Sequence, residues 1–308
     1  MGVGMKQYFE MLKRSLKDFL DDECPQMAAA LSYYTIFSLP PLLVLIMVLV
    51  GVFMDPQDVR EALSSQMGNL MGAGAKQQVM EIFESADQPD VSRGLAGLLG
   101  IAALIFGATG AVGQLQAALN KAWEVAPDPE QGGLKNFIGK RILSFGMILG
   151  IAFLLLVSLT VSAMLSAFGD ALGAMGGISG PLLYLFNLVV SLVVITLLFA
   201  AMFKVLPDAE IAWKDVAVGA LVTTVLFLIG KFAIGLYLGR SDPGEAFGAA
   251  GALAIMLVWI YYSSLILLFG AEFTQTWAVR RGSGIRPEPG AVRVEESTRV
   301  VEKRPKQA

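Results

Sequence analysis

PLLYLFNLVVSLVVITLLFAAMF, residues 181–203, is a predominantly apolar run that contains no charged side chain. About 20 such residues are enough for a helix to cross the hydrocarbon core of a bilayer. Five further runs of similar length lie at about 32–54, 94–118, 142–168, 215–238 and 249–273, and only Lys231 is charged well inside any of the six. The sequence therefore predicts an all-α polytopic membrane protein with a bundle of six transmembrane helices over 31–279.

The composition of the chain agrees with this prediction and narrows the possible chemistry. Of the 308 residues 55% are hydrophobic and 16% are charged, whereas about a quarter of a soluble domain is charged. The chain has no histidine, and Cys24 is its one cysteine, so zinc sites and histidine-based nucleophilic catalysis lack their usual residues. A net charge of -3 argues against a nucleic-acid partner. We therefore expect no enzyme activity, no metal and no cofactor.

The basic residues predict the orientation of the bundle. If the N-terminus lies inside, 18 of the 23 lysines and arginines fall in inner segments and four fall in outer loops. Inner loops of membrane proteins carry the excess of positive charge. Both termini are therefore predicted to be cytoplasmic.

Residues 1–30 precede the first long apolar run and contain a second kind of pattern. Apolar side chains recur over 5–20 at steps of three and four residues: Met5, Tyr8, Phe9, Leu12, Leu16, Phe19 and Leu20. Lysines and an arginine occupy the other faces, as is typical of an amphipathic helix. Two interpretations stay open, a helix lying on the inner leaflet and a helix packed beneath the bundle.

Two connecting segments also carry predictions. The outer loop at 55–92 fits two short amphipathic helices separated by the glycines at Gly72 and Gly74, which would cap the outer mouth of the bundle. After about 280 the chain becomes polar and contains two prolines in the stretch 286–289. Residues 280–308 are therefore predicted to form a disordered cytoplasmic tail.

The first span contains a candidate site. Pro40 and Pro41 remove two helical backbone donors and favour a break, and broken helices bind substrate in many transporters. The hydroxyls of Tyr33, Tyr34 and Ser38 lie just upstream. A simple kink with interfacial tyrosines is an equal alternative.

Two ionisable residues complete the polar set together with Asn187. Lys231 lies in the outer half of the fifth span, where it either reaches the headgroups or faces a polar cavity. Glu272 lies at the inner end of the sixth span, too deep to pair with Lys231, and is expected to pair with Lys140 or Arg141. In a transporter, Lys231 would meet an anionic group and Glu272 would lock the inner gate.

The second span shows glycines at three-residue steps, Gly107, Gly110 and Gly113. They leave a nearly bare helix face that another backbone can approach closely. This pattern favours helix packing over a functional role.

Four segments together resemble a known family. They are 30–41 (ALSYYTIFSLPP), 118–123 (ALNKAW), 206–220 (with LPD, WKDV and GA) and 247–273 (with FGAAGAL, LVWIYY and GAEF). Their order and spacing are similar to those of the YihY/BrkB family of bacterial inner-membrane proteins, over about residues 10–280.

The resemblance implies a six-helix bundle in a bacterial inner membrane but no secure activity. Members have carried a virulence-factor label, a ribonuclease label, and suggestions of permease or lipid transport. The ribonuclease label fits this sequence poorly, because the chain lacks histidine and a basic face.

We expect a transporter or flippase-like protein for a lipid or small amphipathic solute. The alternative is a non-transporting scaffold or envelope-assembly protein. Membrane lipids are the expected partners, with a second copy of the chain or an envelope protein as further possibilities.

Overall fold

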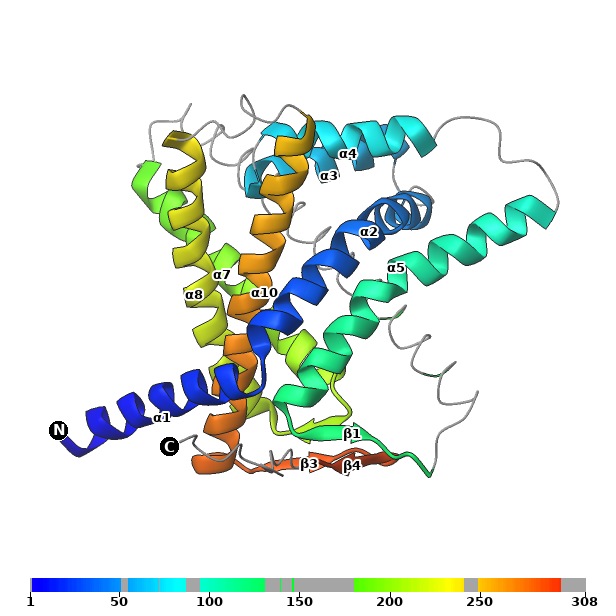
Figure 1. The fold of residues 1–308 in the computed structure, drawn as a ribbon. Coiled ribbons are helices and arrows are strands. Elements are labelled where there is room, and N and C mark those ends of the chain that lie inside the picture. Colours follow the sequence, from blue (N-terminus) through cyan, green and yellow to red (C-terminus); the bar gives the residue numbers. More distant parts are fainter. Residues whose placement is uncertain are drawn as a thin grey trace, which may run out of the picture.

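The chain is described by a computed structural model over residues 2–50, 55–71, 73–86, 95–130, 139, 146, 180–240 and 249–294. Helices dominate these residues: α1 (Gly2–Asp21), α2 (Cys24–Val50), α3 (Pro56–Met71), α4 (Ala73–Ala86), α5 (Leu95–Ala122), α7 (Gly180–Val205), α8 (Trp213–Arg240) and α10 (Ala249–Arg280). Figure 1 shows α7, α8 and α10 running nearly together, with α2 and α5 leaning away from them as a pair.

Four of the described helices are long and apolar enough to cross a membrane, over Cys24–Val44, Leu188–Val205, Trp213–Ile234 and Leu253–Arg280. Helix α5 covers the second predicted span. The third predicted span, 142–168, lies outside the described residues except for Gly146. The membrane character of the bundle is therefore visible in the structure, while the count of six helices stays a prediction.

The first transmembrane helix begins earlier than predicted. Glu23 has a φ of 56°, a left-handed conformation that interrupts the α-helical path. Helix α1 thus ends at Asp21 and α2 begins at Cys24 rather than near residue 32. The reason is packing, since Cys24, Ala28 and Leu31 are all buried and follow the helical step of four and three residues.

The two short helices predicted between the first two spans are present as α3 and α4, although Gly74 lies within α4 rather than between the two helices. Figure 1 shows both helices lying across one end of the bundle. Val79 and Phe83 of α4 are buried in one apolar cluster with Met256 and Trp259 of α10. This contact fixes the pair against the transmembrane helices.

The opposite end carries four short strands, and we call it the strand end (Figure 1). Strand β1 (Val125–Pro127) follows α5, β2 (Ala209–Ile211) lies between α7 and α8, and β3 (Ile285–Pro287) and β4 (Ala291–Arg293) follow α10. Strand β1 pairs antiparallel with β4, and β2 pairs antiparallel with β3.

The fold is mostly helical, as predicted, and these four short strands are an addition to it. They correct one prediction: the segment 280–308 is not disordered throughout, because 285–293 contains two strands. The physical reason is that backbone groups of this segment pair with those of β1 and β2, which lie in the connections that follow α5 and α7. Gly284, with a φ of 76°, permits the turn before β3, and Gly290, with a φ of 90°, permits the turn between β3 and β4. Residues 295–308 lie outside the described part.

Candidate functional site

Pro40 and Pro41 do not break the first transmembrane helix, so the first of their two interpretations, a broken helix, is wrong. Helix α2 runs without interruption from Cys24 to Val50. Proline is tolerated in membrane helices where neighbouring helices compensate for the lost hydrogen bond. Here the ring of Pro41 lies over Gly107 of α5, where a Cβ would come within 2.8 Å of the ring.

The glycine face of α5 has the packing role predicted for it. Ser38 of α2 is 5% exposed, and its hydroxyl would lie 3.3 Å from a Cβ at Gly110. Pro41 lies over Gly107 in the same way. Because these two positions of α5 carry no side chain, α2 can pack closely against α5. Ser38 and Pro41 therefore serve the contact between two helices.

The tyrosines expected beside Ser38 point elsewhere. Tyr33 and Tyr34 are 59% and 44% exposed, and the Tyr33 ring lies 4.8 Å from the ring of Phe37, which is itself exposed. These aromatic side chains form an outward-facing group on α2. The structure thus separates the tyrosines from Ser38 and does not gather them into one site.

The structure leaves open the roles predicted for two other residues, Lys231 and Asn187. Lys231 is partly buried on α8 between the exposed side chains of Ile229 and Phe232, a position that suits either of its two interpretations. Asn187 lies in α7, but its side chain is outside the described part. Lys140 and Arg141, the expected partners of Glu272, are also outside it.

Glu272 is placed at the junction of α1, α2 and α10. Its side chain is 1% exposed, and the buried thiol of Cys24 donates a hydrogen bond to its Oε1 at 3.5 Å. The carboxyl group of Asp22, in the turn between α1 and α2, lies close by. The partners of Glu272 among the described residues therefore come from the N-terminal segment.

A second polar cluster, which sequence reasoning missed, surrounds Asp208 at the strand end. Gln116 and Asn120 of α5 donate hydrogen bonds to the two carboxylate oxygens of Asp208 at 3.1 and 2.8 Å. The backbone N–H of Asp208 donates to Oδ1 of Asn120 at 2.8 Å. The backbone N–H of Glu288 donates to the Asp208 carbonyl at 3.0 Å. One residue thus ties α5, the α7–α8 connection and the C-terminal segment together.

The Asp208 cluster also affects the titration of a neighbour. Burial, and after it the negative charge of Asp208, raises the pKa of Glu288. Both effects disfavour the ionised carboxylate.

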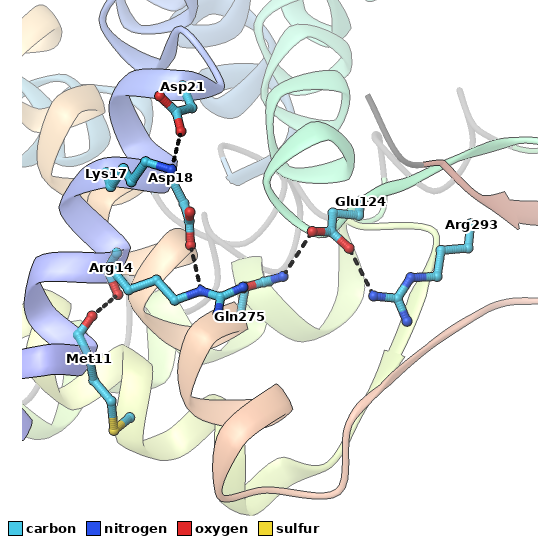
Figure 2. A network of polar contacts seen from close by, with 9 residues as sticks. Met11, Arg14, Lys17, Asp18, Asp21, Glu124, Gln275 and Arg293 are labelled. Carbon is cyan, nitrogen blue, oxygen red and sulfur yellow. Dashed lines mark hydrogen bonds and ion pairs between the residues drawn. The ribbon is translucent and has the colours of Figure 1, made fainter. Parts of the chain in front are cut away.

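Further polar contacts hold the C-terminal segment against the bundle. Asp215, 4% exposed near the start of α8, accepts a hydrogen bond from the Ser283 N–H at 2.9 Å. Figure 2 shows Glu124 between two partners, accepting from Gln275 of α10 at 3.4 Å and pairing with Arg293 of β4 at 2.9 Å. These contacts close the strand end.

Helices α8 and α10 meet through a reciprocal pair of small residues. Thr274 of α10 lies against Gly219 of α8, and Thr223 of α8 lies against Gly270 of α10. Each threonine hydroxyl donates to the carbonyl of the glycine four residues earlier on its own helix, at 2.6 Å for Thr274 and 2.8 Å for Thr223. The hydroxyls are thus satisfied within their helices, and the glycines allow the two backbones to approach.

Comparison with known proteins identifies the family. A family profile described as Virulence factor BrkB matches residues 15–295. A UPF0761 membrane protein of Psychrobacter is 27% identical over 283 residues, covering 91% of this chain and 50% of the relative. Another from Ralstonia nicotianae is 28% identical, covering 85% and 57%, and one from Alkalilimnicola ehrlichii is 31% identical, covering 84% and 56%.

The chain spans only about half the length of these relatives, and no solved structure matches it. The relatives are named as membrane proteins, in agreement with the apolar helices described above. Two of the segments that carried the resemblance, 118–123 and 206–220, meet at the strand end, where Asn120 donates a hydrogen bond to Asp208. The chain is therefore a membrane protein that belongs to the virulence factor BrkB family.

Proposed function

We propose that the chain is a transporter or flippase-like protein that moves a lipid or a small amphipathic solute. The observation that carries this proposal is Glu272, a carboxyl group 1% exposed near the inner end of the long, predominantly apolar helix α10. An ionisable side chain inside a membrane span is costly and marks a functional site by default. A helix that only anchored the chain would have no need of it.

The helix contacts are compatible with movement. Helices α2 and α5, and likewise α8 and α10, meet in part at glycines, although Phe227 of α8 and Trp259 of α10 also contact each other. Small residues let two helices come close and shift while their hydrogen bonds stay within each helix. Such contacts suit a bundle that opens toward one side and then toward the other.

We also propose that the strand end faces the cytoplasm of a bacterial cell and that the protein lies in the inner membrane. The excess of lysine and arginine in the inner segments supports this orientation. Helix α1 lies at the same end (Figure 1). Six transmembrane helices would complete the bundle once the third predicted span is included.

Helix α1 is proposed to lie in the surface of the inner leaflet while packing on α10. Met11, Ser15 and Phe19 are buried, whereas a row of four apolar side chains, at Phe9, Leu12, Leu16 and Leu20, is exposed. Lys13 and Lys17 each follow a leucine of this row by one residue, about 100° around the helix. Lysines beside an exposed apolar row are typical of a helix at the boundary between headgroups and acyl chains.

The test is leaflet exchange in liposomes that carry fluorescent phospholipids and the purified protein, followed with a membrane-impermeant quencher. We expect exchange faster than in empty liposomes and its loss in Glu272→Gln, which removes the ionisable group with little change in shape. Lys231→Leu tests whether the second ionisable residue lies on the route. Lys214→Leu, at an exposed position of the same helix, is its matched control.

A second candidate function, a scaffold that does not transport, is favoured by the Asp208 cluster. Asp208 ties three segments together and closes the strand end. A rigid bundle of this kind could hold envelope proteins or a second copy of the chain. Exchange no faster than in empty liposomes, for wild type and variants alike, would support the scaffold and refute lipid movement.

A further inference from the structure

The buried carboxyl group of Glu272 faces a second carboxyl group. Asp22 lies in the short turn between α1 and α2, and its side chain is close enough to Glu272 to share a hydrogen bond with it. The Cys24 thiol, 0% exposed, donates to the other side of the same carboxyl group at 3.5 Å. Two acids and a thiol from the α1–α2 turn, the start of α2 and α10 therefore meet, with Glu272 and Cys24 buried and Asp22 partly exposed.

The charges around this group come from each neighbouring element. Asp18 in the last turns of α1 adds a further negative charge toward Glu272. Lys121 of α5 contributes a positive charge near Cys24. The described surroundings of Glu272 thus hold more acid than base, and two carboxylates in contact cannot both be ionised at low cost.

We propose that Glu272 and Asp22, together with the Cys24 thiol, form a proton-binding site that holds the α1–α2 turn against α10. With one proton bound, the protonated carboxyl group donates to the other carboxylate, and the turn stays closed. When the proton leaves to water at the strand end, two negative charges face each other. Their repulsion moves the turn away from α10 and exposes Cys24.

The structure around the turn suits such a movement. Glu23, between Asp22 and Cys24, has a φ of 56°, which makes this the point at which the helical path is already interrupted. Opening there would alter one connection while leaving α2 and α10 intact. This proton-dependent switch goes beyond the proposed function and does not depend on it. If the chain is a transporter, the same proton would be the coupling ion, and only that extension rests on the proposed function.

Cys24 is the chain's one cysteine and therefore reports on the opening without any engineered label. The experiment measures the rate at which a small water-soluble maleimide labels the full chain in mild detergent at several pH values between about 6 and 9, a range in which thiolate reactivity can be followed. Labelling of the SDS-unfolded chain at each pH corrects for the ionisation of a free thiol.

We expect wild type and Glu272→Gln to label at similar low rates near pH 6. Wild type should label about tenfold faster near pH 9 than near pH 6. Release of one proton changes an equilibrium by this factor over one pH unit. Loss of a neighbouring negative charge would by itself make the thiol ionise more readily and label faster in the variant. Faster labelling of wild type therefore reports opening of the turn.

Asp22→Asn provides a second variant that leaves α10 unchanged, and it should remove the same pH-dependent rise. Glu23→Gln removes an exposed charge from the same turn and should keep the wild-type curve. Equal pH curves for wild type and the first two variants would overturn the proposal, and so would a folded wild type that resists labelling at every pH. Because no step measures transport, this outcome is separate from that of the exchange assay.

Discussion

Adding one methyl group at Gly107 should destabilise the contact between α2 and α5, whereas the same change at Gly110 should not. A Cβ at Gly107 would lie 2.8 Å from Cγ and 3.3 Å from Cβ of Pro41. These atoms belong to a ring fixed in the backbone, so the helices themselves must separate. A Cβ at Gly110 would meet only the Ser38 hydroxyl, at 3.3 Å, and that hydroxyl can rotate away.

The magnitude follows from two terms. Overfilling a packed contact costs about 1–3 kcal/mol. Replacing glycine by alanine inside a helix contributes up to about 1 kcal/mol in the other direction, but this term is common to both positions. The difference between Gly107→Ala and Gly110→Ala isolates the steric cost, and we expect Gly107→Ala to be the less stable by about 1–3 kcal/mol.

The assay is equilibrium unfolding in mixed micelles of mild detergent and SDS, followed by tryptophan fluorescence. Pro41→Ala removes the ring and should reduce the cost of Gly107→Ala, giving a coupling of about 0.5–3 kcal/mol in a double-mutant cycle. Equal free energies of unfolding for the two glycine variants would refute this account of the contact, as would additivity with Pro41→Ala.

Three further predictions concern the strand end. Asp208→Ala should lower the free energy of unfolding by about 2–4 kcal/mol, because two buried amide donors lose a charged acceptor, whereas Glu210→Ala, at an exposed site next to it, should change little in the same assay. A raised pKa means that Glu288 contributes most to stability when it is protonated below its unfolded pKa, and that this contribution is lost as pH rises through its folded pKa. The unfolding midpoint of wild type should therefore fall over that window relative to Glu288→Gln, and parallel pH curves would contradict the shift. Arg281→Ala should loosen the attachment of α1, so that limited proteolysis cuts α1 faster than in wild type. The reason is that the Arg281 guanidinium lies 4.7 Å from an aromatic ring of α1 and donates hydrogen bonds to that helix. The control variant Arg280→Ala should be cut at the wild-type rate.

Most of the helices could be predicted because long apolar runs leave few alternatives. Helices α7, α8 and α10 contain or nearly contain the predicted spans. The early start of α2 was missed because the apolar criterion overlooks small residues, although Cys24, Ala28 and Leu31 already show helical spacing. The strands were missed because three residues are too few to show an alternating pattern.

The candidate site was predicted only in part. Glu272 stands out in the sequence as an acid inside an apolar run, but its described contacts come from residues about 250 positions earlier, such as Cys24. The importance of Asp208 was not apparent, because its partner Asn120 is 88 residues away and looked like an ordinary interfacial amide. Periodicity reports which face of a helix is apolar, and it carries no information about which distant polar groups will meet.

The pairing of the strands has a consequence for how the protein is made. Strands β1 and β2 belong to connections between helices, and their partners β3 and β4 follow α10. During synthesis, the connections that contain β1 and β2 are made first, and their backbone edges stay unpaired until α10 has entered the membrane. The strand end can therefore close only after α10 and the segment that follows it have been made. Until then, the backbone groups of β1 and β2 lack these partners, and unpaired strand edges of this kind can pair with other chains.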